Sequence, residues 1–359
     1  MERRGFLRAG GAVGVGLALP ACRPLQGLGI PVRVHQPGLA EGHRLRDAGP
    51  LPTPTRELRT GVAILGSGVA GLTAAWRLAR DGHDDFLLLD GPEPDGNAAG
   101  GRFDSPSGPL LHPCGAHYLP LPSMESRGVR ELLFELGVIE AEPFSERPRF
   151  SEAALVHAPD ERLYFDGAWH EGLLPTGQVS AEEAGQHQRF LAEVAALTRR
   201  RGSDGRRLFC VPRALSSMDA DWRQLDALPF RDWLVARGYN APSLHTWLDY
   251  VCRDEYGAGP EQVSAWAGLH YFAGRGGHAA NAADGTVLTW PEGLAFLTRG
   301  LRARVPAARQ QTGHALRVDE TREGVRILCQ DATGAFLVHA RRAICAMPLH
   351  VTARVVPHL

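Results

Sequence analysis

The sequence contains no lysine, because all 39 of its basic side chains are arginine. A protein without lysine cannot form the Schiff base of a pyridoxal phosphate enzyme, build the lysine-bearing loop of the P-loop NTPases, or use serine–lysine chemistry. These enzyme classes are therefore excluded. Glycine (42) and proline (26) are also abundant, so we interpret the absence as a codon bias toward arginine.

Net charge is nearly absent as well. The 39 basic and 40 acidic side chains leave a net charge of -1, so no overall field attracts nucleic acid or an anionic lipid surface. We expect a small-molecule substrate and no nucleic-acid partner. A chain of 359 residues with 44% hydrophobic and 22% charged residues is typical of a soluble globular protein of about two domains.

Cysteine is sparse, and its six positions include no CxxC pair and no spacing typical of a zinc site. No HExxH motif is present, so we expect no metal. Buried free thiols are the simplest interpretation. One disulfide involving Cys114, Cys210 or Cys252 is the alternative if the protein is exported.

The N-terminus carries a twin arginine, Arg3–Arg4, followed by a weakly hydrophobic run over residues 9–19. This pattern resembles a twin-arginine export signal, and the run is too short to cross a bilayer, which takes ~20 residues. We predict a signal peptide over residues 1–22 and a periplasmic protein. Residues 19–22 also resemble a lipoprotein cleavage box, which would leave Cys22 acylated and the protein membrane-anchored. Residues 23–59 are rich in proline and glycine and predict an extended linker.

Residues 60–90 predict a strand, a glycine-rich turn, a helix and a second strand. The turn contains Gly66, Ser67, Gly68, Val69, Ala70 and Gly71. In this pattern Gly66 allows the tight turn, Gly68 lets the backbone approach a pyrophosphate, and Gly71 lets the helix pack closely on the strand. The helix N-terminus stabilises the anion. The sequence therefore predicts a dinucleotide-binding site.

An acidic residue, Asp90, ends the second strand, where a carboxylate binds a ribose hydroxyl. The acid favours an adenosine ribose with a free 2′-hydroxyl, and thus FAD or NAD rather than NADP.

Two short motifs follow: Gly100–Gly101–Arg102 and the small-residue step Gly115–Ala116. Together with the turn they resemble the flavin amine oxidase superfamily, which includes monoamine and polyamine oxidases, protoporphyrinogen oxidase and carotenoid desaturases. The resemblance implies FAD as the cofactor, with the Gly-Gly-Arg segment near its pyrophosphate and the small-residue step beside its isoalloxazine ring. The family's acid is usually glutamate, whereas this chain has Asp90 and a longer loop after it.

Two later segments extend the resemblance. Residues 289–301 look like the family's Pro-x-Gly entry to a helix, and residues 343–348 resemble its strand ending in Ala-x-Pro. Between them a β meander is predicted over Ala315–Val318, Val325–Cys329 and Phe336–Val338. The resemblance implies that Ala315 contacts the adenine side of FAD and that Ala346 returns to the FAD sheet.

The middle of the chain predicts mainly helices. A helical pattern covers residues 128–136, a hairpin turn is expected at Asp166–Gly167, and Ser180 with Glu183 forms a capping box before a helix that reaches Arg200. Aromatic residues gather between residues 245 and 275. The catalytic residues stay unknown, with His117, Tyr256, His270 and Trp290 as candidates that line the substrate side. The alternative for each is an aromatic of the core or a histidine held by a backbone carbonyl.

The predicted fold class is α/β, a Rossmann-like FAD-binding domain with an inserted α+β substrate domain. The predicted units are the signal peptide (1–22), the linker (23–59), the first part of the FAD domain (60–122), the substrate domain (123–284) and the second part of the FAD domain (285–359). Family members continue past the Ala-x-Pro strand with segments that complete the FAD site. We therefore expect a C-terminally truncated chain, or a second polypeptide that completes the site.

The resemblance implies an FAD-dependent oxidoreductase that transfers a hydride from a substrate C–H bond, next to an amine nitrogen, to flavin N5. Two alternatives remain: a desaturase or oxidase acting on a polyene or tetrapyrrole, and a non-catalytic FAD-binding protein. An NAD dehydrogenase is less consistent with the Gly-Gly-Arg segment, since a nicotinamide site does not use that contact.

Overall fold

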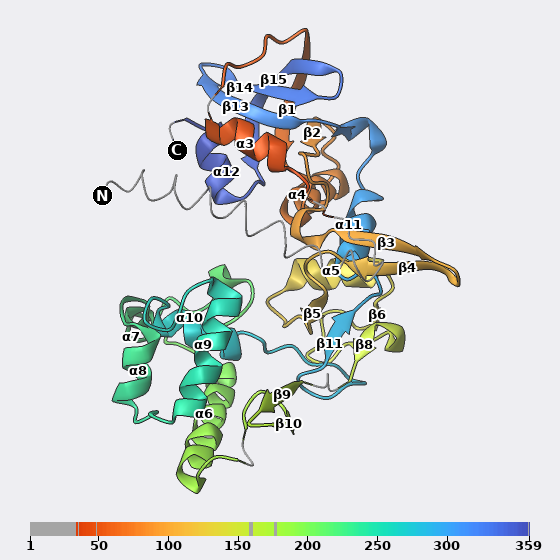
Figure 1. Cartoon of the computed structure of the whole chain (residues 1–359). Coiled ribbons are helices and arrows are strands. Elements are labelled where there is room, and N and C mark those ends of the chain that lie inside the picture. Colours follow the sequence, from red (N-terminus) through yellow and green to blue (C-terminus); the bar gives the residue numbers. More distant parts are fainter. Residues whose placement is uncertain (1–33, 35, 48, 158–160, 176–177, 358) are drawn as a thin grey trace, which may run out of the picture.

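The structure is a computed structural model that describes residues 34, 36–47, 49–157, 161–175, 178–357 and 359. The predicted signal peptide and Cys22 lie outside the described residues. Figure 1 shows one part of the molecule built around a large sheet and a second part built mainly of helices.

A six-stranded sheet forms the first part, in the order β12-β2-β1-β15-β14-β13. Its strands are β1 (Arg56–Leu65), β2 (Phe86–Leu89), β12 (Gln310–Gln311), β13 (His314–Thr321), β14 (Gly324–Asp331) and β15 (Gly334–Cys345). Strand β1 pairs in parallel with β2 and β15, while β13, β14 and β15 form an antiparallel meander. The sheet therefore joins strands from both ends of the described chain, as predicted for a split Rossmann-like domain.

Helices cover both faces of this sheet. They are α3 (Leu39–Asp47), α4 (Val69–Arg80), α11 (Ala295–Arg302) and α12 (Leu349–Val355). On one face, Leu72 and Trp76 of α4 pack with Ile64 of β1 and Leu301 of α11. On the other face, α12 and α3 pack over strands β13 to β15. A sheet covered on both faces explains the continuous apolar runs of β1 and β2.

The N-terminal boundary differs from the predicted extended linker over residues 23–59. Helix α3 forms within it, because Leu45 packs against the sheet core and Arg44 donates a hydrogen bond to Gln330 at 2.7 Å. Strand β1 begins at Arg56 rather than near residue 60. Its first half is polar and half-exposed, so only its pairing with β15 identifies it as a strand.

The meander is longer than predicted. The segment expected as a separate strand over residues 343–348 is the continuation of β15, which runs unbroken to Cys345. The sequence does not show this continuity, because the polar residues His339, Arg341 and Arg342 interrupt the apolar residues of β15. Alternate residues of a strand point to opposite faces, so polar residues can stand between apolar ones within one strand.

The second part is mainly helical. Its helices are α6 (Ala181–Arg199), α7 (Ala220–Arg223), α8 (Phe230–Ala236), α9 (Pro242–Tyr256) and α10 (Ala265–Ala273). Helix α5 (Arg127–Glu135) lies instead beside α4 and α11, where Leu132 packs with Leu72 and Leu301. The N-cap half of the predicted capping box is confirmed, since the Ser180 hydroxyl accepts a hydrogen bond from the Glu183 N–H at 3.2 Å at the start of α6. The Glu183 carboxylate accepts instead from the Ser243 hydroxyl of α9, so the reciprocal bond of the box is replaced by a contact between helices. The aromatic segment predicted to line a substrate site contributes largely to a core, in which Trp266 and Phe209 pack against Phe230.

Short strands connect the two parts. They are β3 (Gly100–Ser105), β4 (Gly108–Pro113), β5 (Tyr118–Pro120), β6 (Ile139–Ala141), β7 (Arg149–Phe150), β8 (Leu155–Val156), β9 (Arg162–Phe165), β10 (Ala168–Glu171) and β11 (Val287–Thr289). Strand β11 pairs with both β5 and β8. The chain therefore leaves at β5 and returns beside it at β11. The predicted hairpin turn is present between β9 and β10, with φ 49° at Asp166 and φ 78° at Gly167.

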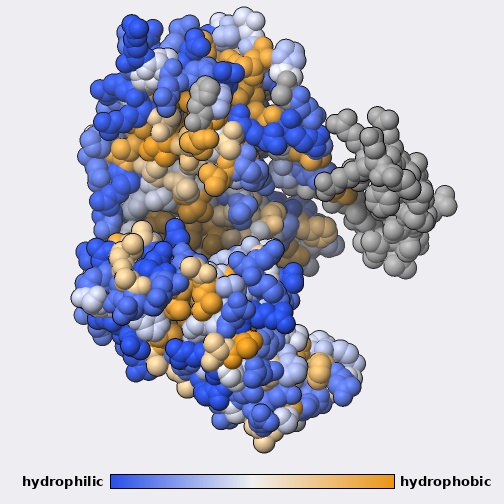
Figure 2. All heavy atoms as spheres, turned by 90° about the vertical axis from the view of Figure 1, so that its left-hand side faces the viewer, coloured by the Kyte–Doolittle hydropathy of each residue, from blue (hydrophilic) through white to orange (hydrophobic). Residues whose placement is uncertain are grey.

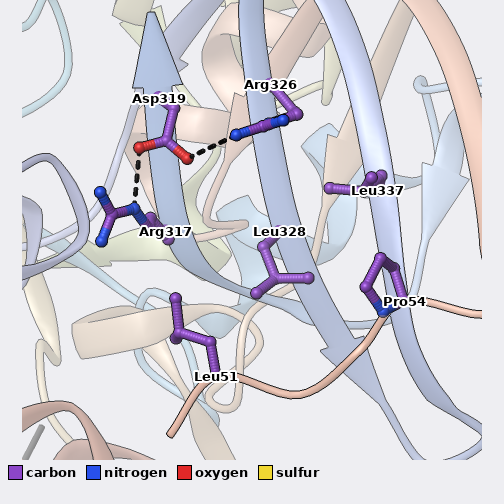
Figure 3. A pocket seen from close by; sticks show the side chains of 7 residues that line it. All are labelled: Leu51, Pro54, Arg317, Asp319, Arg326, Leu328 and Leu337. Atoms are coloured by element: carbon purple, nitrogen blue, oxygen red, sulfur yellow. Dashed lines mark hydrogen bonds and ion pairs between the residues drawn. The ribbon is translucent and has the colours of Figure 1, made fainter.

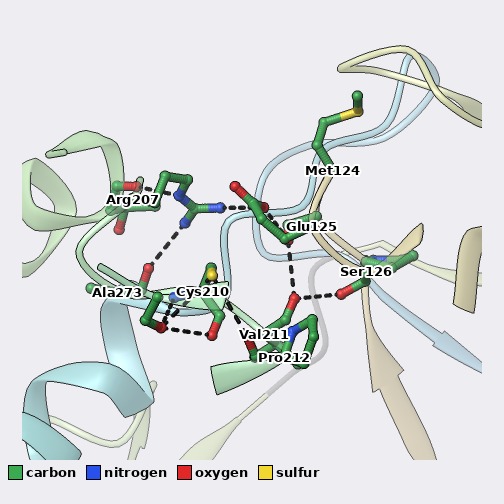
Figure 4. Close-up of polar contacts among 12 residues, drawn as sticks. Met124, Glu125, Ser126, Arg207, Cys210, Val211, Pro212 and Ala273 are labelled. Atoms are coloured by element: carbon green, nitrogen blue, oxygen red, sulfur yellow. Dashed lines mark hydrogen bonds and ion pairs between the residues drawn. The ribbon is translucent and has the colours of Figure 1, made fainter. Parts of the chain in front are cut away.

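An arginine and a glutamate tie the helical part to the segment before α5 (Figure 4). Arg207 pairs with Glu125 at 3.3 Å and also donates hydrogen bonds to the carbonyls of Thr198 and Ala273. The Ser126 hydroxyl donates to the Val211 carbonyl at 2.6 Å. This network bridges elements that are far apart in the sequence.

Among the helices of the described residues, none combines the length and apolar character needed to span a bilayer. In the same part of the chain, no group of three or more histidine, cysteine, aspartate or glutamate side chains is arranged to hold a metal ion. The five cysteines that the structure describes are all free thiols.

Candidate dinucleotide-binding site

The glycine turn connects β1 to α4 and brings the carboxyl end of the strand to the N-terminus of the helix. Gly66 has φ +106°, a conformation that favours glycine. A Cβ on Gly71 would lie 1.8 Å from the Gly66 carbonyl oxygen, so no larger residue fits there. Both glycines are required by the packing of the chain itself.

Gly68 differs from these two glycines. Its φ is −68°, which any residue adopts, and a Cβ built on it would meet no atom closer than 3.9 Å. The protein's own atoms therefore do not require glycine at this position. Its small size leaves room beside the backbone for a ligand.

The N-terminus of α4 lies at this open space. Val69 and Ala70 are exposed, and no side chain caps the helix. The first backbone N–H groups of an α-helix have no partner within the helix, and they bind anions readily. Ser67, by contrast, is buried, and its hydroxyl donates a hydrogen bond to the Asp90 carbonyl at 2.9 Å.

Asp90 follows β2 and stands beside the turn. Its backbone is fixed, because its carbonyl accepts the Ser67 N–H at 3.1 Å and its N–H donates to the Gln311 carbonyl at 3.1 Å. Its carboxylate is half-buried and lies at the position where a dinucleotide fold binds a ribose hydroxyl.

Arg302 is a site residue that the sequence did not reveal. It ends α11, and its guanidinium donates to Asp90 Oδ1 at 2.8 Å, to the Ser67 hydroxyl at 3.1 Å and to Asp95 Oδ1 at 3.4 Å. Burial lowers the pKa of Arg302, but the hydrogen bond and charge of Asp90, together with Asp95, outweigh it and raise the pKa above its ordinary value. Arg302 is therefore a permanent positive charge at the site.

The loop after β2 crosses the turn through Asp95 and Gly96. Asp95 forms a bridge with Gly68, and its N–H donates to the Ser67 carbonyl at 3.3 Å. Gly96 also lies next to Gly68. These residues precede the predicted Gly-Gly-Arg motif, so the loop, rather than that motif, contacts the turn.

The predicted Gly100–Gly101–Arg102 segment forms strand β3 of a protruding hairpin. Arg102 is exposed and pairs with Asp104 at 2.8 Å. A Cβ on Gly101 would lie 2.4 Å from the His112 ring, which explains the glycine through packing within the hairpin. The structure thus places Arg302, not Arg102, in contact with the glycine turn.

The small-residue step is joined to the Pro-x-Gly motif. The Leu294 N–H donates to the Ala116 carbonyl at 3.0 Å, and the Ala116 N–H donates to the Asn97 carbonyl at 2.8 Å. Gly115 is needed here, since a Cβ on it would lie 2.4 Å from that same carbonyl oxygen. Two predicted segments, the small-residue step and the Pro-x-Gly segment, therefore meet at Ala116 together with the loop that contains Asn97.

The two remaining predicted contacts, Ala315 and Ala346, differ in position. Ala346 lies against the turn, where its N–H donates to the Leu65 carbonyl at 2.9 Å. Ala315 is buried in the sheet core opposite Cys329. The residues beside Asp90 are instead Gln311, which ends β12, and Gly313, which precedes β13; the Gly313 carbonyl accepts the N–H of Gly91 at 2.9 Å.

The four substrate-side candidates do not converge on one cluster. The Tyr256 hydroxyl donates to the Ala267 carbonyl at 2.8 Å, and a ring nitrogen of His270 lies 2.9 Å from the Cys210 carbonyl oxygen. Trp290 stacks on Phe296 at 4.7 Å. His117 is exposed beside the small-residue step; its ring nitrogen lies 3.4 Å from the Gly115 carbonyl oxygen, and its ring packs edge-on against Tyr118 at 5.1 Å between centroids. Burial lowers the pKa of His270 and raises that of Tyr256.

A separate pocket of about 370 Å³ lies between residues 51–54 and strands β13 to β15 (Figure 3). It is lined by Leu51, Pro54, Arg317, Asp319, Arg326, Leu328 and Leu337. Asp319 pairs with both arginines of this pocket. Because no residue of the glycine turn lines it, this pocket is distinct from the dinucleotide site.

Comparison with known proteins supports the fold. A family model described as an NAD(P)-binding Rossmann-like domain matches residues 64–136, which contain the glycine turn and Asp90. No curated protein matches the sequence.

Three solved structures share the fold. Putrescine oxidase bound to putrescine has a TM-score of 0.57 at 16% identity, over 83% of this chain and 60% of its own. A fatty acid isomerase from P. acnes has a TM-score of 0.55 at 17% identity, over 83% of this chain and 61% of its own. Cyclohexylamine oxidase from Brevibacterium oxydans IH-35A has a TM-score of 0.51 at 16% identity, over 80% of this chain and 58% of its own. The chain thus spans about three fifths of the length of these proteins.

Proposed function

We propose that this chain is an FAD-dependent oxidoreductase of the flavin amine oxidase type. The observation that carries the proposal is Gly68. The protein's own packing does not require a glycine at this position, and the residue lies at an uncapped helix N-terminus. An acidic residue, Asp90, stands beside it. This combination is what a dinucleotide's pyrophosphate and ribose need.

The residues present fit FAD. The backbone of Gly66 to Gly68 and the first turn of α4 would hold the pyrophosphate, and Asp90 would accept a hydrogen bond from the adenosine ribose. The step Gly115–Ala116 would border the flavin ring. When bound, FAD supplies the hydride acceptor, and the protein's own groups bind and orient the reactants.

We propose a substrate C–H bond next to an amine nitrogen as the hydride donor. Two of the structures that share this fold are named as oxidases of putrescine and cyclohexylamine. On the substrate side we retain His117, because its side chain is exposed beside Ala116 and its one hydrogen-bonding contact with the described residues is long, at 3.4 Å. Tyr256, His270 and Trp290 are engaged by their own chain, so their role is structural in this proposal.

An apolar substrate, such as a polyene or tetrapyrrole, is the second candidate. Figure 2 shows apolar side chains gathered in the hollow between the two parts of the molecule. A fatty acid isomerase also shares the fold. An apolar hollow favours a long hydrophobic substrate over a small charged amine.

We further propose that a second polypeptide, or a longer form of the chain, completes the site. The hairpin of β3 and β4 exposes Phe103, Leu110 and Leu111, and a two-stranded hairpin needs cover to be stable. The solved structures that share the fold are also longer than this chain.

The decisive experiment is a visible absorption spectrum of the purified chain, followed by a test for free FAD after acid precipitation. Bands near about 370 and 450 nm with releasable FAD are expected. A panel of amines and of apolar substrates, scored by bleaching of the flavin under anaerobic conditions, then separates the two candidate functions.

The negative outcomes are also informative. If the folded protein binds FAD but none of the tested substrates reduces the bound flavin, the chain is a non-catalytic FAD-binding protein. A chain that binds added FAD and loses it on gel filtration would support the need for a second polypeptide. A folded chain that ignores FAD altogether would overturn the proposal.

The location that we propose is outside the cytoplasm, reached by twin-arginine export, with the protein either periplasmic or anchored through Cys22. The support is the order of the twin arginine, the short apolar run and the cleavage box in the sequence. Export of a folded protein would allow FAD to be inserted before translocation.

A further inference from the structure

The side chain of Arg302 joins four groups that come from separate elements around the glycine turn. One nitrogen contacts Asp90 and Gln310, and the other contacts Ser67 and Asp95. The guanidinium is about a quarter exposed, so it is shielded from water on most sides. The planar guanidinium of arginine can make these contacts at the same time, whereas the ammonium group of lysine could not make all of them.

Asp95 presents an electrostatic problem at this position. Its backbone is bridged to Gly68, next to the space where a pyrophosphate would lie, and its φ of 70° places it in the left-handed region, which few residues other than glycine adopt and which aspartate adopts more readily than most. An unpaired carboxylate there would repel a bound phosphate. Arg302 is the cation that pairs with it.

Asp90 presents a problem of orientation. A carboxylate that is to accept a ribose hydroxyl must be held in one rotamer. Arg302 holds Oδ1, and no group among the described residues donates a hydrogen bond to Oδ2. The second oxygen is therefore available to a ligand.

We propose that Arg302 is the positioning residue of the adenosine half of the site: it orients Asp90 toward the ribose hydroxyls and neutralises Asp95 beside the pyrophosphate. This inference rests on the proposed function, since it assumes that the turn binds a dinucleotide. Asp90, Asp95 and Arg302 together carry a net charge of −1, so the site selects an unphosphorylated 2′-hydroxyl and excludes a 2′-phosphate.

The test compares ADP with 2′-deoxy-ADP by isothermal titration calorimetry, which does not depend on activity. We expect the unaltered chain to bind ADP about tenfold more tightly, because the hydrogen bond from the 2′-hydroxyl to Asp90 is charge-assisted. Arg302→Met should weaken ADP binding and reduce this preference to about twofold or less. Arg302→Lys should retain much of the ADP affinity, since it keeps the charge, but lose most of the preference.

The matched control is Arg304→Met. Arg304 lies two residues later and pairs with Glu135, away from the turn. We expect it to leave both affinities unchanged. Thermal unfolding of each variant shows whether it is folded, so a loss of binding through unfolding is recognised.

A double substitution separates the two roles. Adding Asp95→Asn to Arg302→Met should recover ADP affinity several-fold, because the uncompensated carboxylate is removed, without restoring the preference for the 2′-hydroxyl. No recovery would overturn the neutralising role. An undiminished preference in Arg302→Met would overturn the orienting role and leave the proposed function intact. Failure of the unaltered chain to bind ADP or FAD would overturn the proposed function and this inference with it.

Discussion

At the scale of single residues, glycines with the same sequence signature have different physical roles. Gly71 is constrained by the Gly66 carbonyl, whereas a Cβ on Gly68 would make only ordinary van der Waals contacts, the nearest at 3.9 Å to Gly96. The sequence motif alone assigns both to one function. The distances from a Cβ built on each glycine distinguish the two roles: the fold requires glycine at position 71, and a bound ligand would require it at position 68.

Replacing each glycine with alanine tests this difference. We expect Gly71→Ala to reduce the free energy of unfolding by about 3 kcal/mol, because its Cβ would clash with backbone. Gly68→Ala should leave the unfolding temperature nearly unchanged and weaken FAD binding about tenfold or more, since the methyl group occupies ligand space. Gly185→Ala is the control, because a Cβ there meets nothing within 4 Å. Equal losses of stability in Gly68→Ala and Gly71→Ala would contradict this assignment.

At the scale of elements, the connection between the helical part and the rest depends on Glu125 and Arg207 (Figure 4). Burial raises the pKa of Glu125, but hydrogen bonds from Ser123, its own backbone and Arg207, with the charge of Arg207, outweigh burial and lower the pKa below its ordinary value. A carboxyl group with a lowered pKa in the folded state stabilises the protein when ionised. Its contribution is complete above its unfolded pKa, about 4.3, and is lost as the pH falls through the folded value.

This pH dependence gives a prediction. Glu125→Gln should reduce the free energy of unfolding by about 2 kcal/mol at pH 7, because it removes a charge-assisted pair from a half-buried network. The difference from the unaltered protein should shrink as the pH falls below about 4. Urea unfolding at several pH values measures it. Glu323→Gln, in the exposed turn before β14, is the control. A difference that stays constant with pH would show that charge is not responsible.

At the scale of the whole molecule, one site is assembled from three stretches of sequence. The glycine turn, the loop before β3 and the end of α11 meet because β1 pairs with β15 and α11 packs beside α4. A ligand bound there would contact the first and the last third of the chain together. The complete site therefore exists only when these three stretches have folded together.

The export route can be tested directly. Replacing Arg3 and Arg4 with lysine should keep the protein in the cytoplasm, because twin-arginine signals depend on the arginine pair. Cell fractionation with immunoblotting measures the distribution. Cys22→Ala separates the two destinations: it should release the protein from the membrane fraction if Cys22 is acylated and change nothing if it is not. Unaltered export of the lysine variant would contradict the proposal.

The sequence by itself determined the local features of this protein. The strand, glycine turn, helix and acid were predictable from residues 60–90, since each depends on contacts within a few residues or on one βαβ unit. The N-cap at Ser180 and the turn at Asp166–Gly167 were predictable for the same reason. Helix α3 and the polar half of β1 were not, because neither has an apolar period of its own and both form through contacts with strands near residue 330.

Only the tertiary structure decided which arginine reaches the site. Arg102 stands in the motif that predicts a phosphate contact, yet it lies on an exposed hairpin and pairs with Asp104. Arg302 lies far from the turn in the sequence and touches Ser67 and Asp90 because α11 packs beside α4. A contact between distant segments depends on how helices pack on a sheet, and the local pattern of a single sequence carries no record of that packing.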